Sequence, residues 1–375
     1  MTGTFACIAG GGTGGHVLPG LAIAEALVDD GHERDTIRFV GSTHGPDRQL
    51  VPAAGFTLDT VAGRGIPRRL SVASLRAALS IVRGVFSGIG LIRRMRPSVV
   101  IVLGGYASVP CVVGAVVWRV PMIVTEQNAR ASLASRLAGR FAKACAVPFD
   151  GTDLPRAVVT GNPVRPEILA VDRARDRDEA RRQLDLPLDR TVIGVASGSL
   201  GSTRVNRAVA DLAGRWAGRG DLAIHHAVGD RDWDDPDLAG PGDPSASDPA
   251  ALVYHRVRYE DHIERLYAAS DLYVGRAGGS TVAELTVVGL GSVLVPLPIA
   301  PRDAQTANAE ALVAAGAAVR IPDAELDGTR LATELTPLLA SAATLERMAA
   351  AAHTLAHPDA ARQVAELAQE HARRG

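Results

Sequence analysis

The residues with the clearest chemical potential lie near the N-terminus, in the segment Gly10-Gly11-Gly12-Thr13-Gly14-Gly15-His16. An apolar run at residues 5–9 precedes this segment, and a helical pattern starting at Pro19 follows it. A turn between a strand and a helix presents backbone N–H groups to an anion, and glycine admits the ligand because it has no Cβ. His16 adds a titratable imidazole. The segment therefore predicts a phosphate-binding turn with a candidate general base.

The spacing Gly10-x-Gly12-x-x-Gly15 also matches the dinucleotide-binding fingerprint. That fingerprint needs a carboxylate about 20 residues further on to hold the ribose. The second strand is expected at residues 36–40, and Gly41-Ser42-Thr43-His44 after it contains no carboxylate. The pattern therefore disfavours NAD binding. A purely structural turn is also disfavoured, because five glycines in six positions exceed what a turn needs.

Two more glycine-rich junctions follow apolar runs in the second half of the chain. The segment Ser197-Gly198-Ser199-Leu200-Gly201-Ser202 follows residues 192–196, and Gly278-Gly279-Ser280-Thr281-Val282-Ala283-Glu284 follows residues 272–275. Helix N-termini at such junctions can stabilise a diphosphate without a metal. No metal site is expected, because His and Cys are not grouped and the one spaced carboxylate pair, Asp230-x-Asp232, lies in a polar loop.

The elements that must position these junctions alternate strand-like runs with helical stretches. The expected strands are residues 5–9, 36–40, 99–103, 122–125, 192–196, 222–227, 272–275, 292–296 and 318–321. This repetition predicts an α/β fold of two Rossmann-like parallel-sheet domains facing a cleft. We place the domains at residues 1–163 and 164–349, with a hinge at 162–166. A C-terminal helix at about residues 350–375 can pack back on the first domain. Residues 230–249 are expected to form a solvated loop.

Composition narrows the class of protein. The chain has 375 residues, of which 47% are hydrophobic and 4% aromatic, and a formal net charge of −1. Its three cysteines, Cys7, Cys111 and Cys145, lack the spacing of a metal site or a disulfide framework, which indicates a reducing compartment. No signal peptide or bilayer-spanning run is evident. These features predict a protein in the cytosol or on the cytosolic side of a membrane.

The segment from Thr60 to Thr125 is strongly basic, with nine arginines and no acidic residue. The arginines are Arg64, Arg68, Arg69, Arg76, Arg83, Arg93, Arg94, Arg96 and Arg119. From Leu75 to Phe86, apolar residues recur at helical spacing. The pattern fits a surface for anionic lipid headgroups and fits an ordinary core-facing helix equally well. Nucleic acid is disfavoured, because aromatic side chains for base stacking are scarce.

Several separated motifs occur together in a specific order, from about Phe5 to about Ile321. They are Gly10 to His16 followed by Pro19-Gly20-Leu21-Ala22, Gly104-Gly105-Tyr106, Glu126-Gln127-Asn128, Gly161-Asn162-Pro163-Val164-Arg165, Gly198-Ser199-x-Gly201, Arg276-x-Gly278 through Glu284, and Asp303-x-Gln305-x-x-Asn308. Each motif alone is weak, but the ordered set is specific. In these motifs the chain resembles the MurG-type glycosyltransferases.

The resemblance implies a two-domain GT-B fold and an inverting, metal-independent transfer. The transferred group is GlcNAc from UDP-GlcNAc, which is a substrate and not a cofactor. The acceptor is the 4-hydroxyl of MurNAc-pentapeptide linked to undecaprenyl diphosphate, and the product is the lipid-linked peptidoglycan precursor. The resemblance also implies a peripheral protein at the cytoplasmic face of the cell membrane. It favours a lipid-binding surface over a core-facing helix for the segment from Leu75 to Phe86 and its flanking arginines.

By resemblance, the substrate-binding residues fall on the same motifs. They are Thr13, Gly14, Gly15, Tyr106, Asn128, Arg165, Ser199, Gly279, Ser280, Thr281, Val282, Ala283, Glu284 and Gln305. Arg165 and Ser199 would meet the donor diphosphate, and Glu284 would hold the ribose hydroxyls. His16 is the preferred general base, because a helix N-terminus disfavours its protonated form. Glu126 is the rival base, or a carboxylate buried against backbone N–H groups.

Three departures from the family pattern affect the acceptor contacts. Thr125 replaces a frequent histidine, Leu200 a glutamine, and Thr306 the second of a glutamine pair. A related transferase with another lipid or natural-product acceptor therefore stays open as an alternative. A sugar-nucleotide epimerase would need more carboxylates around the donor sugar than Glu126 alone. A non-catalytic binding subunit would not need His16.

Overall fold

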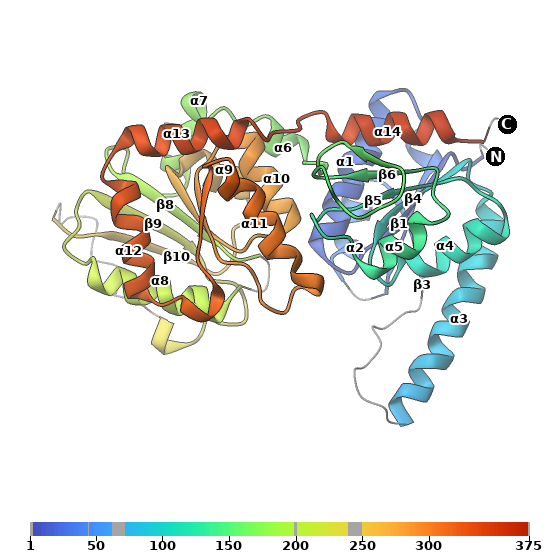
Figure 1. Ribbon diagram of the computed structural model, residues 1–375, viewed down its shortest axis with the longest axis horizontal. Helices are drawn as coiled ribbons and strands as arrows, with labels where there is room; N and C mark the ends of the chain where they lie inside the picture. The colour runs from blue at the N-terminus through green and yellow to red at the C-terminus, as the bar shows by residue number, and fades with distance from the viewer. Residues whose placement is uncertain (1–2, 44, 62–71, 199–200, 239–249, 374–375) are drawn as a thin grey trace. The chain divides into compact units, whose positions relative to one another are not determined.

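The structure is a computed structural model that describes residues 3–43, 45–61, 72–198, 201–238 and 250–373, with only the backbone given for residues 72–82. The chain divides into two compact units (Figure 1). Unit 1 comprises Met1–Arg165 and His357–Gly375, and unit 2 comprises Pro166–Ala356. Each unit is built around its own parallel sheet.

Unit 1 contains a sheet of seven strands in the order β3-β2-β1-β4-β5-β6-β7, with parallel pairing throughout. The strands are β1 (Ala6–Gly10), β2 (Ile37–Ser42), β3 (Thr57–Val61), β4 (Val99–Gly104), β5 (Met122–Thr125), β6 (Ala144–Val147) and β7 (Ala157–Val159). The strand order reverses between β1 and β4. In such sheets, ligands bind outside the carboxyl ends of the strands at this point of reversal.

Two helical layers cover the sheet of unit 1. On one face, α3 (Val72–Met95), α4 (Ser108–Val117) and α5 (Leu133–Gly139) contribute Ile92, Cys111 and Ala138 to one apolar core. On the other face, α1 (Gly14–Asp29), α2 (Asp47–Ala53) and α14 (Ala360–His371) pack into a second core. The last helix of the chain therefore belongs to the first unit.

Unit 2 contains six parallel strands in the order β10-β9-β8-β11-β12-β13. They are β8 (Thr191–Ala196), β9 (Leu222–Ala227), β10 (Val253–Val257), β11 (Leu272–Gly275), β12 (Ser292–Leu294) and β13 (Ala318–Arg320). Its helices are α6 (Pro166–Leu169), α7 (Arg173–Gln183), α8 (Thr203–Arg215), α9 (Ile263–Ala269), α10 (Gly279–Val288), α11 (Ala304–Ala314), α12 (Gly328–Leu339) and α13 (Ala342–His353). Here the strand order reverses between β8 and β11, so both units have the predicted doubly wound topology.

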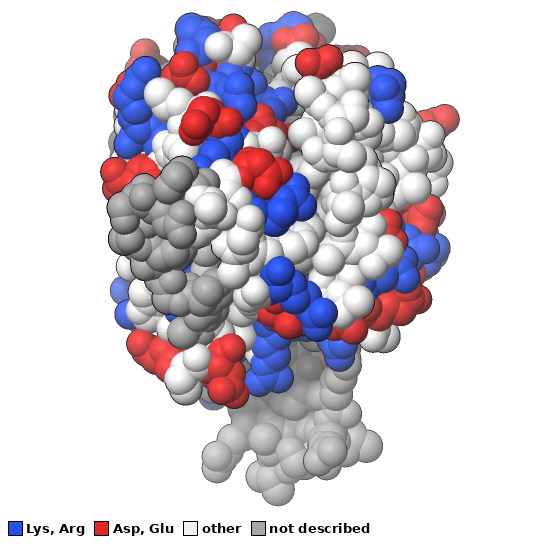
Figure 2. Space-filling model, turned by 90° about the vertical axis from the view of Figure 1, so that its left-hand side faces the viewer, with Lys and Arg blue, Asp and Glu red and all other residues white. Residues whose placement is uncertain are grey.

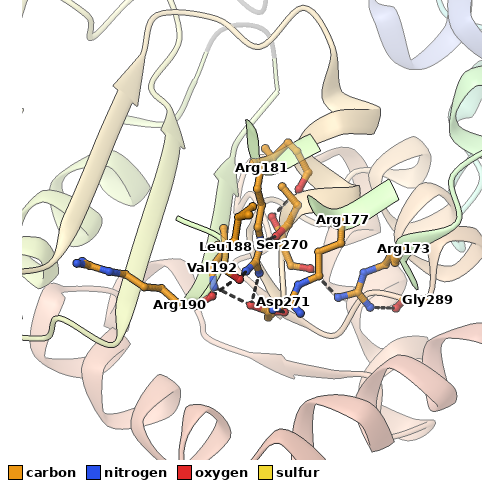
Figure 3. A network of polar contacts seen from close by, with 11 residues as sticks. Arg173, Arg177, Arg181, Leu188, Arg190, Val192, Ser270, Asp271 and Gly289 are labelled. Atoms are coloured by element: carbon orange, nitrogen blue, oxygen red, sulfur yellow. Dashed lines mark hydrogen bonds and ion pairs between the residues drawn. The ribbon is translucent and has the colours of Figure 1, made fainter. Parts of the chain in front are cut away.

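An arginine network fixes the polar helix α7 to this sheet (Figure 3). Arg173, Arg177 and Arg181 lie four residues apart, so they share one face of the helix. The fully buried guanidinium of Arg181 donates from Nη2 to Asp271 Oδ2 at 2.8 Å, and Arg177 lies 3.2 Å from Oδ1. The backbone N–H of Val192 in β8 donates to the same carboxylate at 2.7 Å. The network therefore joins α7 to β8 and β11.

The predicted fold class is confirmed, whereas some element bounds differ. Four strands were not predicted, β3, β6, β7 and β10, of which β7 is only three residues long and has no buried residue. Helix α1 begins at Gly14 and not at Pro19. The sequence pattern did not predict its first turn, because that turn contains two glycines and glycine disfavours helices. The expected C-terminal helix is two helices, α13 and α14, with Pro358 in the segment between them.

Candidate functional site

The glycine turn of unit 1 leaves the carboxyl end of β1 at the reversal of strand order. A buried carboxylate, Asp47 at the start of α2, lies beneath it. Its Oδ1 accepts the backbone N–H of Gly12 at 2.9 Å, and its Oδ2 accepts that of Ser42 at 2.8 Å. A Cβ at Gly11 would clash with Asp47 Oδ2, so the turn requires glycine there. Asp47 thus holds the turn against the end of β2.

His16 lies in the first turn of α1, half-buried against the end of β4. Its Nδ1 is 2.9 Å from Thr13 Oγ1. A Cβ at Gly104 would lie 3.6 Å from His16 Nε2, and one at Gly105 would lie 3.6 Å from Cε1. Burial lowers the pKa of His16, and the negative charges of Glu126 and Asp47 oppose this effect. The two glycine motifs of unit 1 therefore enclose an imidazole that favours its neutral form.

Glu126 follows β5 and is buried, with 2% of its surface exposed. Its Oε1 accepts the backbone N–H groups of Gln127 at 3.0 Å and Asn128 at 3.1 Å, and also the side-chain amide of Asn128 at 3.1 Å. Its Oε2 accepts the backbone N–H of Ser132, the N-cap residue of α5, at 2.9 Å. Four donors on one carboxylate shape the loop between β5 and α5. This geometry favours a positioning role for Glu126 over that of a proton acceptor.

The remaining unit 1 candidates differ in exposure. Tyr106 is 64% exposed just beyond β4, Thr13 and Gly15 are exposed, and Gly14 and Asn128 are half-buried. Arg165, at the end of the first stretch of unit 1, has a buried Nε without a hydrogen-bond partner among the described residues. The side-chain amide of Asn162 is buried and equally unpaired within the described part of the chain. Both groups retain hydrogen-bonding capacity for a ligand or water.

In unit 2, α10 begins directly after the Arg276-Ala277-Gly278 segment that follows β11. The N-cap residue Gly278 has no side chain, so the first N–H groups of the helix receive no cap. Ser280 Oγ is buried, and no described residue hydrogen-bonds to it. Gly279, Thr281 and Ala283 are half-buried, and Val282 is fully buried. This helix start combines free N–H groups with a hydroxyl, which suits an oxyanion ligand.

Glu284 lies in the second turn of α10 and is 8% exposed. The hydroxyl of Tyr267 donates to its Oε2 at 2.8 Å. Burial raises the pKa of Tyr273, and the nearby charge of Glu284 raises it further. Glu284 is therefore held in place by Tyr267 of the unit 2 core.

Two other unit 2 candidates have different outcomes. Gln305, in the first turn of α11, accepts the backbone N–H of Leu297 on its Oε1 at 2.9 Å, which leaves its amide donors for a ligand. Ser199 and Leu200 lie outside the described residues. Thr306 Oγ1 donates to Asp303 Oδ1 at 2.6 Å, so this departure from the family pattern stabilises the start of α11.

Sequence reasoning gave no supporting role to three residues that hold the candidate site residues in place. Asp47 was not singled out, although an acidic residue directly after Gly-Pro is a helix-start signal. Arg276 donates from Nη2 to Ser202 Oγ, the N-cap of α8, at 2.6 Å and pairs with Asp323 at 2.6 Å. Asp232 corrects the expectation of a solvated loop, since it is buried and accepts the Asn206 amide of α8 at 2.9 Å.

Helix α3 lies entirely within the basic segment and is longer than the expected stretch from Leu75 to Phe86. Arg83 is exposed and Phe86 is 70% exposed, whereas Arg64, Arg68 and Arg69 and the side chains of residues 72–82 lie outside the description. Among the described residues no helix is long and apolar enough to cross a membrane. Within the same described part, no group of three or more His, Cys, Asp or Glu is arranged to hold a metal ion.

Comparisons with known proteins give one consistent family. Residues 6–147 match the glycosyltransferase family 28 N-terminal domain, and residues 192–364 match the C-terminal domain of the same family. A protein of Clavibacter michiganensis subsp. michiganensis is 38% identical over 98% of this chain and 96% of its own length. One from Alkalilimnicola ehrlichii is 38% identical over 98% of each chain. Both are named UDP-N-acetylglucosamine–N-acetylmuramyl-(pentapeptide) pyrophosphoryl-undecaprenol N-acetylglucosamine transferase.

A solved structure supports the same relationship. The crystal structure of Acinetobacter baumannii MurG aligns with a TM-score of 0.74 and 27% sequence identity. The alignment covers 98% of this chain and 99% of that one. The similarity thus extends over both units and not over one domain alone.

Proposed function

Because the chain belongs to the MurG family of UDP-N-acetylglucosamine–N-acetylmuramyl-(pentapeptide) pyrophosphoryl-undecaprenol N-acetylglucosamine transferases, we propose that it transfers GlcNAc from UDP-GlcNAc to a polyprenyl-diphosphate-linked MurNAc-pentapeptide. The product is the lipid-linked disaccharide precursor of peptidoglycan. The observation that carries this proposal is the 38% identity over 98% of the chain. Relatives that share only one domain would not support the complete reaction.

We assign donor binding mainly to unit 2. The diphosphate of UDP-GlcNAc would accept hydrogen bonds from the first N–H groups of α10 and from Ser280 Oγ. Arg165 would add a charge-assisted hydrogen bond to the same diphosphate. Glu284 would accept from the ribose hydroxyls, and Gln305 and Asn128 would contact the sugar. Ser199 keeps the diphosphate role that family resemblance gives it.

We assign acceptor activation to unit 1. The 4-hydroxyl of MurNAc attacks the anomeric carbon of GlcNAc as His16 Nε2 removes the hydroxyl proton. A bond forms between the acceptor oxygen and the anomeric carbon, the bond from that carbon to the diphosphate oxygen breaks, and UDP departs with its electron pair. Attack opposite the leaving group inverts the anomeric configuration. The helix N-terminus and Arg165 balance the charge of UDP, so the step needs no metal.

Several residues would position the reacting groups without exchanging protons. Glu126 holds the loop that carries Asn128, through the hydrogen bonds described above. Asp47 holds the turn from Gly12 to Gly15 in front of His16. Thr13 and the exposed Tyr106 would contact the acceptor. Asp47 and Glu126 also bring negative charge near the imidazole, which stabilises it once it is protonated.

We infer that the protein works at the cytoplasmic face of the cell membrane as a peripheral protein. The acceptor carries a polyprenyl chain, which keeps it in the bilayer. The arginine-rich segment that includes α3 would attract anionic headgroups, and the exposed Phe86 would enter the interface. This attraction should weaken as salt is added.

One assay tests the proposal directly. Purified protein is incubated with UDP-GlcNAc and a short-chain lipid-linked MurNAc-pentapeptide without added metal, and UDP release and product mass are measured. A product heavier by one GlcNAc, formed with release of UDP, supports donor, acceptor and metal independence together. Failure to turn over, with UDP still raising the unfolding temperature, would contradict the proposed acceptor but not the donor site.

A further inference from the structure

Two consecutive residues before helix α11 of unit 2 have a left-handed backbone. Arg302 has a φ of 57° and a ψ of 26°, and Asp303 has a φ of 55° and a ψ of 37°. A Cβ makes this conformation costly, and arginine lacks the short polar side chain with which aspartate tolerates it. Among the described residues, no other two neighbours without glycine share a positive φ. Strained residues of this kind persist where the surrounding structure fixes them, and they cluster at functional sites.

The place of this pair in the fold is also unusual. Three isolated left-handed residues lie just after helices, Arg96 after α3, Arg119 after α4 and Asp185 after α7, where this conformation commonly ends a helix. Asp303 instead occupies the N-cap position of α11, where an extended backbone is the rule. Within the described chain its carboxylate caps no backbone N–H of the helix and accepts from Thr306 Oγ1 instead. Helix termination and capping therefore do not explain the pair.

The side chains of the turn do not explain its conformation either. Pro301, Arg302 and Asp303 are all exposed, so no burial in the core requires the left-handed backbone. Charge does not single out Arg302, because basic side chains lie among acidic ones over the face of the molecule drawn in Figure 2, and one more exposed arginine marks no site by itself. The reason for the strain must therefore lie in where the turn directs the chain.

The turn closes a hydrogen-bonded loop on the side chain of Gln305. The N–H of Asp303 donates to the carbonyl oxygen of Ala300 at 3.0 Å, and the N–H of Ala300 donates to that of Leu297 at 3.1 Å. The N–H of Leu297 in turn donates to Gln305 Oε1 at 2.9 Å. The left-handed pair thus turns the chain so that Gln305 returns to a residue eight positions before it.

Three prolines restrict the same loop. Pro296, Pro298 and Pro301 each fix φ near −65° and remove a backbone donor. Few other conformations are therefore open to residues 296–301. The change of direction before α11 falls on residues 302–303.

Both ends of the loop are attached to the segment that leads into α10. Arg276 donates from Nη1 to the carbonyl oxygens of residues 295–296 at 3.1 and 3.2 Å. Asn308 of α11 donates from Nδ2 to the carbonyl oxygen of Ala277 at 3.0 Å. Helices α10 and α11 are also in contact (Figure 1). The carboxamide of Gln305 is thus held relative to the helix start that we assign to the diphosphate.

We propose that the left-handed pair Arg302–Asp303 is a positioning element for Gln305. It directs the carboxamide oxygen to Leu297, which leaves both amide N–H groups for a ligand. These donors select an oxygen acceptor, such as a hydroxyl oxygen of the donor sugar. The inference rests on the proposed function for the identity of that sugar.

Substitutions of Arg302 separate the backbone from the side chain. Arg302→Val adds a β-branched residue, which tolerates a left-handed backbone poorly, whereas Arg302→Gly removes the steric cost. Arg302→Ala keeps a Cβ and removes the guanidinium. KM for UDP-GlcNAc should rise about two- to tenfold in Arg302→Val, the effect of one hydrogen bond, and stay within about twofold of wild type in the other two. The Kd for UDP should not change, since UDP lacks the sugar.

Two results would overturn the proposal. An unchanged KM in Arg302→Val would show that the backbone of this residue does not position Gln305. Equal rises in the valine, glycine and alanine variants would assign the effect to the guanidinium. The matched control is Asp185→Val, which adds the same side chain to the left-handed residue after α7. Both valine variants should lower the urea midpoint, but an equal rise of KM in the control would mean that lost stability, and not the position of Gln305, raises KM.

Hydrogen exchange tests the positioning without catalysis. Residues 296–301 carry only three backbone amides, those of Leu297, Ile299 and Ala300, because the other three residues are prolines. Exchange at Leu297 should be about two- to tenfold faster in Arg302→Val and unchanged or slower in Arg302→Gly. Exchange at the wild-type rate in Arg302→Val would contradict the proposal. If wild-type protein bound no UDP-GlcNAc and exchange still changed as expected, the proposed function would fail and the role of the turn would stand.

The Gln305→Glu variant tests the orientation of the carboxamide. At neutral pH the carboxylate still accepts the N–H of Leu297 but cannot donate. KM for UDP-GlcNAc should therefore rise about tenfold or more, while exchange at Leu297 stays at the wild-type rate. An unchanged KM would contradict donation by the amide. Faster exchange at Leu297 together with a higher KM would show that Gln305 closes the loop and does not donate to the sugar.

Discussion

The imidazole of His16 and the hydroxyl of Thr13 lie 2.9 Å apart, from Nδ1 to Oγ1, across the first turn of α1. If Nδ1–H donates to Thr13, the lone pair of the neutral ring is on Nε2, the atom beside Gly104. This tautomer is the one that general-base catalysis at Nε2 requires. The hydroxyl at the N-cap position thus has a chemical use in addition to its place at the helix start.

Substitution of His16 by alanine should lower kcat by about two to four orders of magnitude, the usual contribution of a general base. The Kd for UDP, measured by calorimetry, should stay within about twofold of the wild-type value, since a general base contributes to the transition state and not to nucleotide binding. Activity that survives the substitution would contradict the assignment. A parallel loss of UDP binding would instead indicate a phosphate-orienting role.

The pH dependence of kcat/KM offers an independent check on His16. Protonation removes the lone pair on Nε2, so the rate falls as the pH drops through the pKa of this imidazole. Burial lowers that pKa from its ordinary value of 6.5, and the acid limb should therefore lie below pH 6.5. The Thr13→Val variant should keep the limb and lose about fivefold in kcat, the cost of one neutral hydrogen bond. A limb above pH 6.5 would contradict the assignment.

The Glu126→Gln variant discriminates between the two candidate bases. If Glu126 only positions the loop, kcat should fall by about tenfold, because one of its hydrogen bonds is replaced by a poor contact. Loss of its negative charge should also lower the pKa of His16, so the acid limb moves to lower pH. A drop in kcat of about three orders of magnitude, with the acid limb abolished, would identify Glu126 as the base.

The sequence predicted the candidate site best where the backbone of a few consecutive residues forms it. The glycine turn before His16 and the start of α10 follow apolar runs directly, so motif and element are read from neighbouring residues. Asp47 could not be found in this way, because its partner Gly12 is 35 residues away and only the packing of α2 against β2 brings them together. The same holds for Arg276, whose partner Ser202 lies 74 residues away.

The missed strands and helix bounds have a related cause. Strand β7 has three exposed residues at the end of the sheet, so it lacks the buried apolar run by which the other strands were recognised. The start of α1 was placed five residues too late, because glycine disfavours helix and Pro19 resembles an N-terminal signal. In both places tertiary contacts override the local pattern.

Ser280 allows a test of the proposed donor site at the start of α10. Replacement by alanine should raise the Kd for UDP by about one to two orders of magnitude, because a hydrogen bond to a charged group contributes about 1.5–3 kcal/mol. Ser292→Ala is the matched control, since its Oγ is also buried without a described partner but lies in β12. Calorimetry with UDP measures both. Equal Kd values in the two variants would remove Ser280 from the diphosphate site.

Asp271 provides a prediction about stability that is independent of substrate. Its carboxylate accepts from the fully buried Arg181 at 2.8 Å, and burial lowers the pKa of that guanidinium (Figure 3). In Asp271→Asn the cation stays buried without its counter-charge, which costs about 3–5 kcal/mol of unfolding free energy. The control Asp176→Asn removes the partner of the exposed Arg175 and should cost less than about 1 kcal/mol.

Urea unfolding of both variants distinguishes the two environments. Trp216 and Trp233 lie in unit 2, so their fluorescence in a Trp118→Phe background reports on the unit that contains the network. The midpoint of this transition should fall clearly in Asp271→Asn and hardly change in Asp176→Asn. Similar midpoints for both would mean that the carbonyl oxygens around Arg181, those of Leu188, Ala269 and Arg190, suffice to hold the guanidinium. Helix α7 would then owe its position to backbone hydrogen bonds and not to the ion pair.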